Sequence, residues 1–162
     1  MPNCLTTSSS TMHVAVETPN QPEVLALIAE LDAYQHALYL PESNHLLDLN
    51  SLLQSRVLFV VARDVARRAL GCGAIVLYPQ YGEIKRMYVQ PRARGKGVAK
   101  AMLATLEAGA AQRGCNTLNL ETGTLQPEAL ALYERSGYQR CGPFGHYRDD
   151  PLSVFMRKAA LA

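Results

Sequence analysis

The sequence predicts an α/β fold of the α+β type, in which helices pack against one mixed β-sheet. Two observations lead to this class. Apolar residues recur at helical spacing in the first part of the chain, whereas from residue 57 onward they form short runs that are typical of strands. From there the expected elements follow in an order of ββα, then βα, then ββ, which implies a mixed sheet flanked by helices.

The first third of the chain is expected to hold one strand and two helices. Residues 13–16 (HVAV) alternate as a short strand does, and a proline suits the first turn of a helix expected over 22–34. The apolar residues at helical spacing in this helix are Val24, Leu27, Ile28 and Leu31. The segment 38–53 contains a proline, so we expect a loop and then a second short helix that restarts after Ser43 or Asn44, either of which is a good N-cap.

Three consecutive strands are expected at 57–62, 71–78 and 82–89. Short turns separate them, so we expect an antiparallel meander. The remaining expected elements are a helix at 97–113, a strand at 117–121, a helix at 127–135, and strands at 138–141 and 152–156. Gly114 and Gly137 follow the two helices as C-terminal stops.

The length of 162 residues fits one domain, which we place at 12–162 behind a flexible segment at 1–11. That Ser/Thr-rich segment has neither a basic start nor an apolar stretch, so we do not expect a secretory signal. Sixteen basic and fourteen acidic side chains leave a net charge of +2, which gives no reason to expect binding to nucleic acid or to a membrane surface. No apolar run approaches the roughly 20 residues that span a bilayer.

The number and spacing of the cysteines and histidines indicate the cellular compartment and whether a metal is bound. The four cysteines are scattered and form no CxxC pair, so reduced thiols and a cytoplasmic location are expected. The four histidines are isolated, and none joins a cluster with metal-ligand spacing, so no metal is expected.

The segment at 83–103, EIKRMYVQPRARGKGVAKAML, is the most informative part of the chain. It runs from a strand through a glycine-containing loop into a helix, whose start leaves about four N–H groups unpartnered and carries roughly half a positive charge. Because Gly95 and Gly97 lack a Cβ, an anion can approach these N–H groups closely. The basic residues around the same point are Arg92, Arg94, Lys96 and Lys100. The segment therefore predicts a phosphate or pyrophosphate site.

Other phosphate motifs do not fit this segment. The GxxxxGK[ST] spacing of a P-loop is absent, and a G-x-G-x-x-G fingerprint would require glycine where Lys100 stands. The alternative interpretation is a basic loop that is simply solvated.

Two motifs give the chain a resemblance to the GNAT superfamily of N-acetyltransferases. Arg92-x-x-Gly95-x-Gly97, between a strand and a helix, is similar to that family's [Q/R]-x-x-G-x-[G/A] signature for acetyl-CoA. Residues 129–138, ALALYERSGY, resemble its A-x-x-L-Y-E-x-x-G-[F/Y] segment. The two motifs stand in the expected order and separation, and the resemblance covers about 57–156 and, loosely, the helices before it.

The resemblance implies a mostly antiparallel sheet of six to seven strands with about four helices, whose fourth and fifth strands splay apart. Acetyl-CoA is the implied cosubstrate, with its pantetheine arm along the backbone of 87–89 and its pyrophosphate on the N–H groups of 94–99. The implied cofactor-binding residues are Met87, Tyr88, Val89, Arg92, Arg94, Gly95, Lys96, Gly97, Val98, Ala99 and Gln126. At Gln126 the chain departs from the pattern, because many members have asparagine there.

Three residues are candidates for the acid and the base, because acetyl transfer needs a deprotonated amine and a stabilised thiolate. Tyr133 matches the position where many members carry a hydroxyl near the CoA sulfur; the alternative is that it only packs. Glu83 stands where some members keep a catalytic glutamate, and its alternative is an ion pair with Lys85 or Arg86. Glu121 ends the fifth strand on its polar face and could act as the base or hold a cationic acceptor.

The acceptor pocket of this fold is walled by the first helices and the last strands, here 39–47 and 142–150. The residues expected to bind the acceptor are Asn44, His45, Glu121 and Tyr147. The resemblance implies an enzyme that transfers an acetyl group to the primary amine of a small molecule in a ternary complex, and it allows a homodimer, since members often pair through their late strands. The alternatives are acetylation of a protein or peptide amine, a non-catalytic acyl-CoA-binding regulatory module, and nucleic-acid binding, which the near-neutral charge disfavours.

Overall fold

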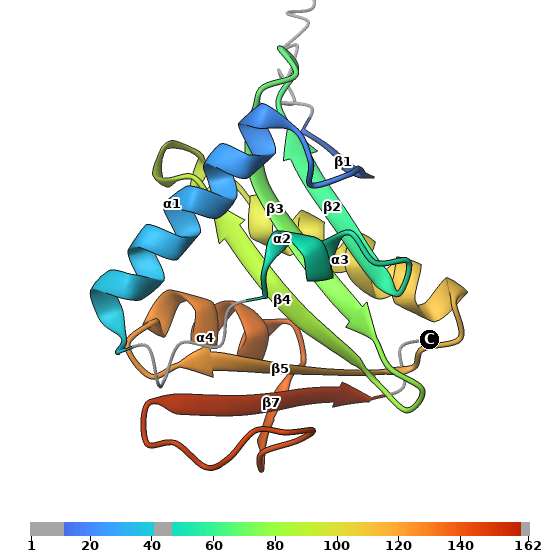
Figure 1. Cartoon of the computed structure of the whole chain (residues 1–162), viewed down its shortest axis with the longest axis vertical. Helices are drawn as coiled ribbons and strands as arrows, with labels where there is room; N and C mark the ends of the chain where they lie inside the picture. The colour runs from blue at the N-terminus through green and yellow to red at the C-terminus, as the bar shows by residue number, and fades with distance from the viewer. Residues whose placement is uncertain (1–11, 41–46, 160–162) are drawn as a thin grey trace, which may run out of the picture.

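The computed structural model describes residues 12–40 and 47–159 of the chain (Figure 1). The strands form one sheet in the order β1-β2-β3-β4-β5-β7-β6. The strands are β1 (His13–Val16), β2 (Val57–Arg63), β3 (Ala69–Leu77), β4 (Gly82–Val89), β5 (Thr117–Gly123), β6 (Gln139–Cys141) and β7 (Ser153–Ala159). The helices are α1 (Pro22–Leu38), α2 (Leu49–Leu52), the 3-10 helix η2 (Pro91–Ala93), α3 (Val98–Gln112) and α4 (Pro127–Arg135).

Helices cover both faces of the sheet, so the sheet has a hydrophobic core on each side. In Figure 1, α1 and α2 lie in front of the sheet and α3 runs behind it. The front core includes Val24, Leu27, Leu31, Leu52, Phe59 and Val61. The rear core, which joins α3 and α4 to the sheet, includes Met102, Leu103, Leu106, Leu118, Leu120, Tyr133 and Met156. The alternating burial of the strands divides their side chains between these two cores.

The central strands confirm the predicted antiparallel meander, since β2 pairs with β3 and β3 with β4 in antiparallel register. β4 and β5 are parallel, but their pairing covers only Gly82–Ile84 against Leu118–Leu120. Beyond this point β4 continues to Val89 and β5 to Gly123, and Figure 1 shows the two strands diverging. The expected splay of the fourth and fifth strands is therefore confirmed.

A β-bulge lies at the point where β4 leaves β5. The register between β3 and β4 shifts between Cys72 and Ala74, and on the opposite strand Arg86 has a φ of 59°. A left-handed conformation costs a non-glycine residue on the order of 1 kcal/mol. The guanidinium of Arg86 offsets this cost, because it forms an ion pair with Asp32 of α1 and donates to the carbonyl of Leu47 at 2.8 Å. The bulge increases the local twist and turns the end of β4 away from β5.

The predicted elements are present, and the largest difference concerns α2. This helix begins at Leu49, later than expected, because Asp48 caps it by accepting a backbone N–H at 2.8 Å. The suggested caps, Ser43 and Asn44, lie outside the described residues, as does the segment expected to be flexible at 1–11. In the described part of the chain, no helix has the length and apolarity needed to cross a bilayer.

Candidate active site

A groove of about 990 Å³ opens where β4 and β5 diverge. The end of β4 at Met87–Val89 forms one wall and α4 another, while the loop before α3 lines one end. The groove is lined by every residue expected to bind acetyl-CoA except Arg92 and Lys96. Because β5 does not pair with this part of β4, the strand edge leaves main-chain groups available to an extended ligand, apart from the carbonyl of Val89, which accepts from the side chain of Arg94.

The loop that leads into α3 presents a row of backbone donors to this groove. Within the described chain, the N–H groups of residues 95–100 donate to no protein acceptor. The N–H group of Arg94 was expected to join them, but it donates to the carbonyl of Pro91 at 3.3 Å. Gly95 and Gly97 have φ angles of 76° and 78°, a conformation that favours glycine. A Cβ on either glycine would meet no protein atom within 4 Å. The donors and the positive end of the helix therefore face open space that suits an anion.

The arginines of this region differ in their positions. The Nε of Arg94 donates to the carbonyl of Val89 at 3.1 Å, and its guanidinium carbon lies 5.8 Å from the centre of the Tyr88 ring. Arg94 thus lies over the end of β4 and lines the groove. Arg92 instead donates from Nε to the side-chain oxygen of Gln90 at 2.9 Å, and it does not line the groove.

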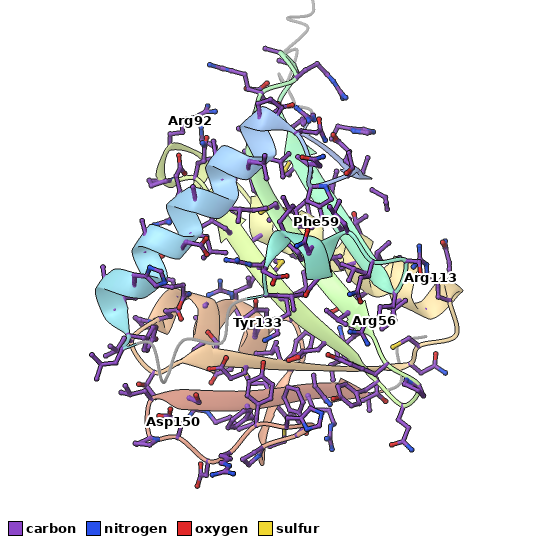
Figure 2. All side chains as sticks on the ribbon, viewed as in Figure 1. Arg56, Phe59, Arg92, Arg113, Tyr133 and Asp150 are labelled. Atoms are coloured by element: carbon purple, nitrogen blue, oxygen red, sulfur yellow. The ribbon has the colours of Figure 1, made fainter. Side chains whose placement is uncertain are left out.

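Tyr133 of α4 lines both this groove and a second, smaller cavity, and it lies between β4 and β5 in Figure 2. The residue is only 5% exposed, and its ring packs edge-on against Tyr138 with centroids 5.7 Å apart. Burial raises the pKa of the Tyr133 phenol above its usual value, so the hydroxyl keeps its proton across neutral pH. No hydrogen bond joins this hydroxyl to another described residue. Since buried polar groups are normally satisfied, an unpaired hydroxyl at this point suits a ligand atom.

The second cavity extends from Tyr133 to the end of α1. Gln126 forms part of its wall: the side-chain oxygen accepts from the hydroxyl of Tyr39 and from the N–H of Gly123, each at 3.3 Å. The Tyr39 hydroxyl in turn accepts the N–H of Leu125 at 3.3 Å. Gln126 therefore ties the ends of α1 and β5 to the start of α4. Tyr39 belongs to the segment 39–47 that was expected to wall the acceptor pocket, but its hydrogen bond to Gln126 could not be predicted because the two residues lie 87 positions apart.

The two candidate carboxylates lie on the front face of the sheet, in different surroundings. Glu121 lines the second cavity together with Tyr133, and the hydroxyl of Ser153 donates to its Oε1 at 3.0 Å. Glu83 is 4% exposed and does not line that cavity. Glu121 therefore shares a cavity with the phenol of Tyr133, whereas Glu83 is almost completely buried.

Glu83 belongs to a buried hydrogen-bond network. The hydroxyl of Tyr147, expected to bind the acceptor, donates to Oε1 of Glu83 at 2.7 Å. The ammonium of Lys85 lies 3.4 Å from the same oxygen and also donates to the Tyr147 hydroxyl. Burial, and then the negative charge of Glu83, raise the pKa of Tyr147 above its usual value. The ion pair of Glu83 with Lys85, which the sequence had suggested as an alternative, is therefore present.

A third cavity of about 820 Å³ lies between the β3–β4 turn and the loop from β6 to β7. Aromatic side chains of both segments line it, and Lys85 lines both this cavity and the second one. The tyrosines of the β3–β4 turn were missed from the sequence because they stand in a turn rather than in a motif. Asn44 and His45, expected to bind the acceptor, lie outside the described residues. Among the residues that are described, no three His, Cys, Asp or Glu side chains gather in a way that could hold a metal ion.

A splayed sheet with an open strand edge and a row of free amides is the arrangement of an acetyl-CoA-dependent acetyltransferase, and comparison with known proteins agrees. The profile of the Acetyltransferase (GNAT) family matches residues 24–138. An IAA acetyltransferase from Azospirillum brasilense is 47% identical over 147 residues, which are 90% of this chain and 95% of the relative.

Solved structures agree with this match. A Klebsiella pneumoniae protein assigned as an acyl-CoA N-acyltransferase is 44% identical, with a TM-score of 0.82 over 93% of this chain and 98% of its own. The PaiA N-acetyltransferase of Thermoplasma acidophilum in complex with coenzyme A shares the fold, with a TM-score of 0.71 at 14% identity over 92% of this chain and 99% of its own. The chain belongs to the GNAT family, and it is an acetyl-CoA-dependent N-acetyltransferase.

Proposed function

We propose that the protein transfers the acetyl group of acetyl-CoA to the primary amine of a small molecule, with both substrates bound at the same time. The observation that carries this proposal is the position of Tyr133, whose buried hydroxyl has no partner among the described residues and lies where the groove meets the second cavity. The groove suits the donor and the cavity suits the acceptor. The name of the Azospirillum relative, IAA acetyltransferase, supports an acceptor of small size.

Two sets of main-chain groups would hold acetyl-CoA. The free N–H groups of residues 95–99, at the positive end of α3, suit the diphosphate. The open edge of β4 at Met87–Val89 would bond the pantetheine amides as an added strand does. Arg94 and Lys100 line the same groove and add positive charge. When bound, acetyl-CoA supplies an acetyl group already activated as a thioester, so the side chains need only orient the reactants and move protons.

Tyr133 would protonate, or donate a hydrogen bond to, the sulfur as it becomes a thiolate. Its raised pKa keeps the phenol protonated at neutral pH, so the hydroxyl can donate a hydrogen bond to the sulfur. Its burial also supports the role, since a hydrogen bond to a developing negative charge is stronger when water is excluded.

The acceptor's ammonium must lose a proton before the nitrogen attacks. We assign this proton to Glu121, because its carboxylate lines the second cavity together with Tyr133, whereas Glu83 and its partner Tyr147 do not line that cavity. Glu121 would hold the ammonium beside Tyr133. We therefore expect Glu121→Gln to lower kcat and to raise the KM of the amine, and Glu83→Gln to have a smaller effect on both.

Thiol release from acetyl-CoA, measured with a panel of small primary amines and of peptides, tests the proposal. We expect release that depends on a small amine, and acetyl-CoA should raise the melting temperature more than RNA or DNA does. Binding of acetyl-CoA without thiol release from any amine would instead indicate a regulatory module, and release with peptides alone would indicate a protein or peptide acceptor.

A further inference from the structure

We propose that Tyr138 is a positioning residue for Tyr133, and that its ring holds the Tyr133 phenol where the groove meets the second cavity. The inference rests on the proposed role of Tyr133 and extends it to a residue that lines neither space. It starts from the way in which α4 ends, because this end brings the two rings together.

The hydroxyl of Tyr133 does not orient its own ring, because no other described residue forms a hydrogen bond with it. A tyrosine ring turns about a torsion with broad minima, so its orientation must come from packing. Among the aromatic rings of the described residues, only that of Tyr138 meets the Tyr133 ring, at an interplanar angle of 71° and with centroids 5.7 Å apart. Rings at this angle and separation attract each other beyond ordinary apolar contact.

The backbone at the end of α4 fixes how the two rings meet. The N–H group of Tyr138 donates to the carbonyl of Tyr133 at 3.0 Å, and that of Gly137 donates to the carbonyl of Glu134 at 3.1 Å. With the φ of 95° at Gly137, these two bonds define a Schellman motif. A contact between the side chains of the first and last residues is common in this motif, and here those residues are Tyr133 and Tyr138. The helix end therefore folds the second ring back onto the first.

An ion pair between two other elements holds the far end of the Tyr138 ring. The hydroxyl of Tyr138 donates to Oε1 of Glu107 in α3 at 2.9 Å, and the ammonium of Lys158 in β7 lies 3.1 Å from Oε2 of the same carboxylate. This ammonium also lies 5.7 Å from the centre of the Tyr138 ring, which is only 2% exposed. The ring is thus fixed by its backbone at one end and by a charge-assisted hydrogen bond at the other. It offers Tyr133 a rigid edge to pack against.

The alternative is that Tyr138 only joins α3 and α4 to β7. The two interpretations depend on different parts of the side chain, since joining the elements requires the hydrogen bond to Glu107, whereas positioning Tyr133 requires the ring. Tyr138→Phe removes the hydrogen bond and keeps the ring, and Tyr138→Leu removes both. We therefore expect Tyr138→Phe to lower stability alone and Tyr138→Leu to lower both stability and kcat.

Thiol release from acetyl-CoA is measured with the primary amine that gives the fastest release in the panel above. In Tyr138→Leu we expect kcat to fall about twofold to tenfold, the range that an aromatic pair contributes, and the Kd of acetyl-CoA to stay unchanged because Tyr138 does not line the groove. Tyr138→Phe should keep the kcat of the wild type although its melting temperature falls by about 3–12 °C, since it loses a hydrogen bond to a charged group. If Tyr138→Leu does not fold, Tyr138→Met takes its place, because methionine fills irregular space in a core.

The same measurements in the Tyr133→Phe background test whether Tyr138 acts through the Tyr133 hydroxyl. Without this hydroxyl, Tyr138→Leu should lower kcat no further, whereas a general effect on the fold would lower kcat by the same factor in both backgrounds. Three results would overturn the inference: equal factors in the two backgrounds, an equal loss of kcat in Tyr138→Phe and Tyr138→Leu, or an unchanged kcat in Tyr138→Leu while Tyr133→Phe lowers it.

Crystal structures of the wild type and of Tyr138→Leu, each with CoA bound, give a readout that requires no acceptor. We expect the Tyr133 ring in one orientation in the wild type, and displaced or in two orientations in the variant. A Tyr133 ring that keeps its place in Tyr138→Leu would overturn the inference. If instead Tyr133→Phe keeps the kcat of the wild type, the proposed role of the Tyr133 hydroxyl fails, and a displaced ring in Tyr138→Leu still supports Tyr138 as the residue that positions it.

Discussion

Gly97→Asp is the substitution that most directly perturbs the proposed diphosphate site. Gly97 precedes α3, and its Cα faces space in which a Cβ would meet no protein atom within 4 Å. The substitution therefore removes no protein contact. It places a carboxylate where the diphosphate would bind the N–H groups of residues 95–99. We expect weaker binding of acetyl-CoA and an intact fold.

The expected loss of acetyl-CoA affinity follows from charge repulsion. At a separation of about 5 Å, two unit charges repel by about 1 kcal/mol at a dielectric constant of 80 and by about 3 kcal/mol at 20. The Kd of acetyl-CoA should thus rise roughly fivefold to 150-fold. The φ of 78° has a separate effect on stability, because an L-residue in the left-handed region costs on the order of 1 kcal/mol of folding free energy.

Gly114 offers a matched control at the other end of the same helix. It has the same φ of 78°, and a Cβ there also meets no protein atom within 4 Å. Gly114→Asp therefore introduces the same backbone strain and the same charge, away from the groove. Its free energy of unfolding should fall at least as much as that of Gly97→Asp, because a carboxylate is unfavourable at the negative end of a helix.

Isothermal titration calorimetry with acetyl-CoA measures the Kd of both variants, and urea denaturation measures their free energy of unfolding. We expect only Gly97→Asp to lose affinity, while both variants remain folded. An unchanged Kd in Gly97→Asp, or an equal loss of affinity in Gly114→Asp, would refute the assignment of the diphosphate to this loop.

Three further changes test other parts of the molecule. Tyr133→Phe should lower kcat about tenfold to hundredfold, in the lower range of general acid catalysis, without changing the Kd of acetyl-CoA; an unchanged kcat would remove its proposed role. Glu17→Gln tests the hydrogen bond from Arg63, which lowers the pKa of Glu17 below its ordinary 4.5. The stabilisation by the Glu17 carboxylate is complete above the ordinary pKa and is lost as the pH falls through the lowered pKa. The melting temperature of the wild type should therefore fall more steeply below pH 4.5 than that of the variant. Parallel melting curves for the two proteins would contradict this. Gly123→Ala should cost about 1–3 kcal/mol in urea denaturation, because its Cβ would lie 1.5 Å from the Tyr39 hydroxyl, and a neutral effect would show that Tyr39 moves freely.

Local sequence patterns predicted the segments that line the groove between β4 and β5. The helical spacing of α3 and the glycines before it fix the row of free amides, because a helix start and its preceding loop depend on neighbouring residues only. The motif around Tyr133 likewise placed this residue beside the groove. Its burial and its unpaired hydroxyl became visible only in the folded chain.

Contacts between distant segments could not be predicted from one sequence. The hydrogen bond of Tyr39 with Gln126 joins residues 87 positions apart, and that of Tyr147 with Glu83 joins residues 64 apart. The left-handed backbone conformation of Arg86 could not be predicted from residue propensities either, because an ion pair with α1 stabilises it. The cavity proposed for the acceptor depends mainly on such contacts, so its wall could not be predicted from the sequence alone.

A crystal structure of the protein with acetyl-CoA bound tests the central claim most directly. We expect the diphosphate oxygens within hydrogen-bond distance of the N–H groups of residues 95–99, and the sulfur beside the hydroxyl of Tyr133. A nucleotide bound elsewhere, with the loop before α3 empty and Tyr133 remote from the sulfur, would contradict it.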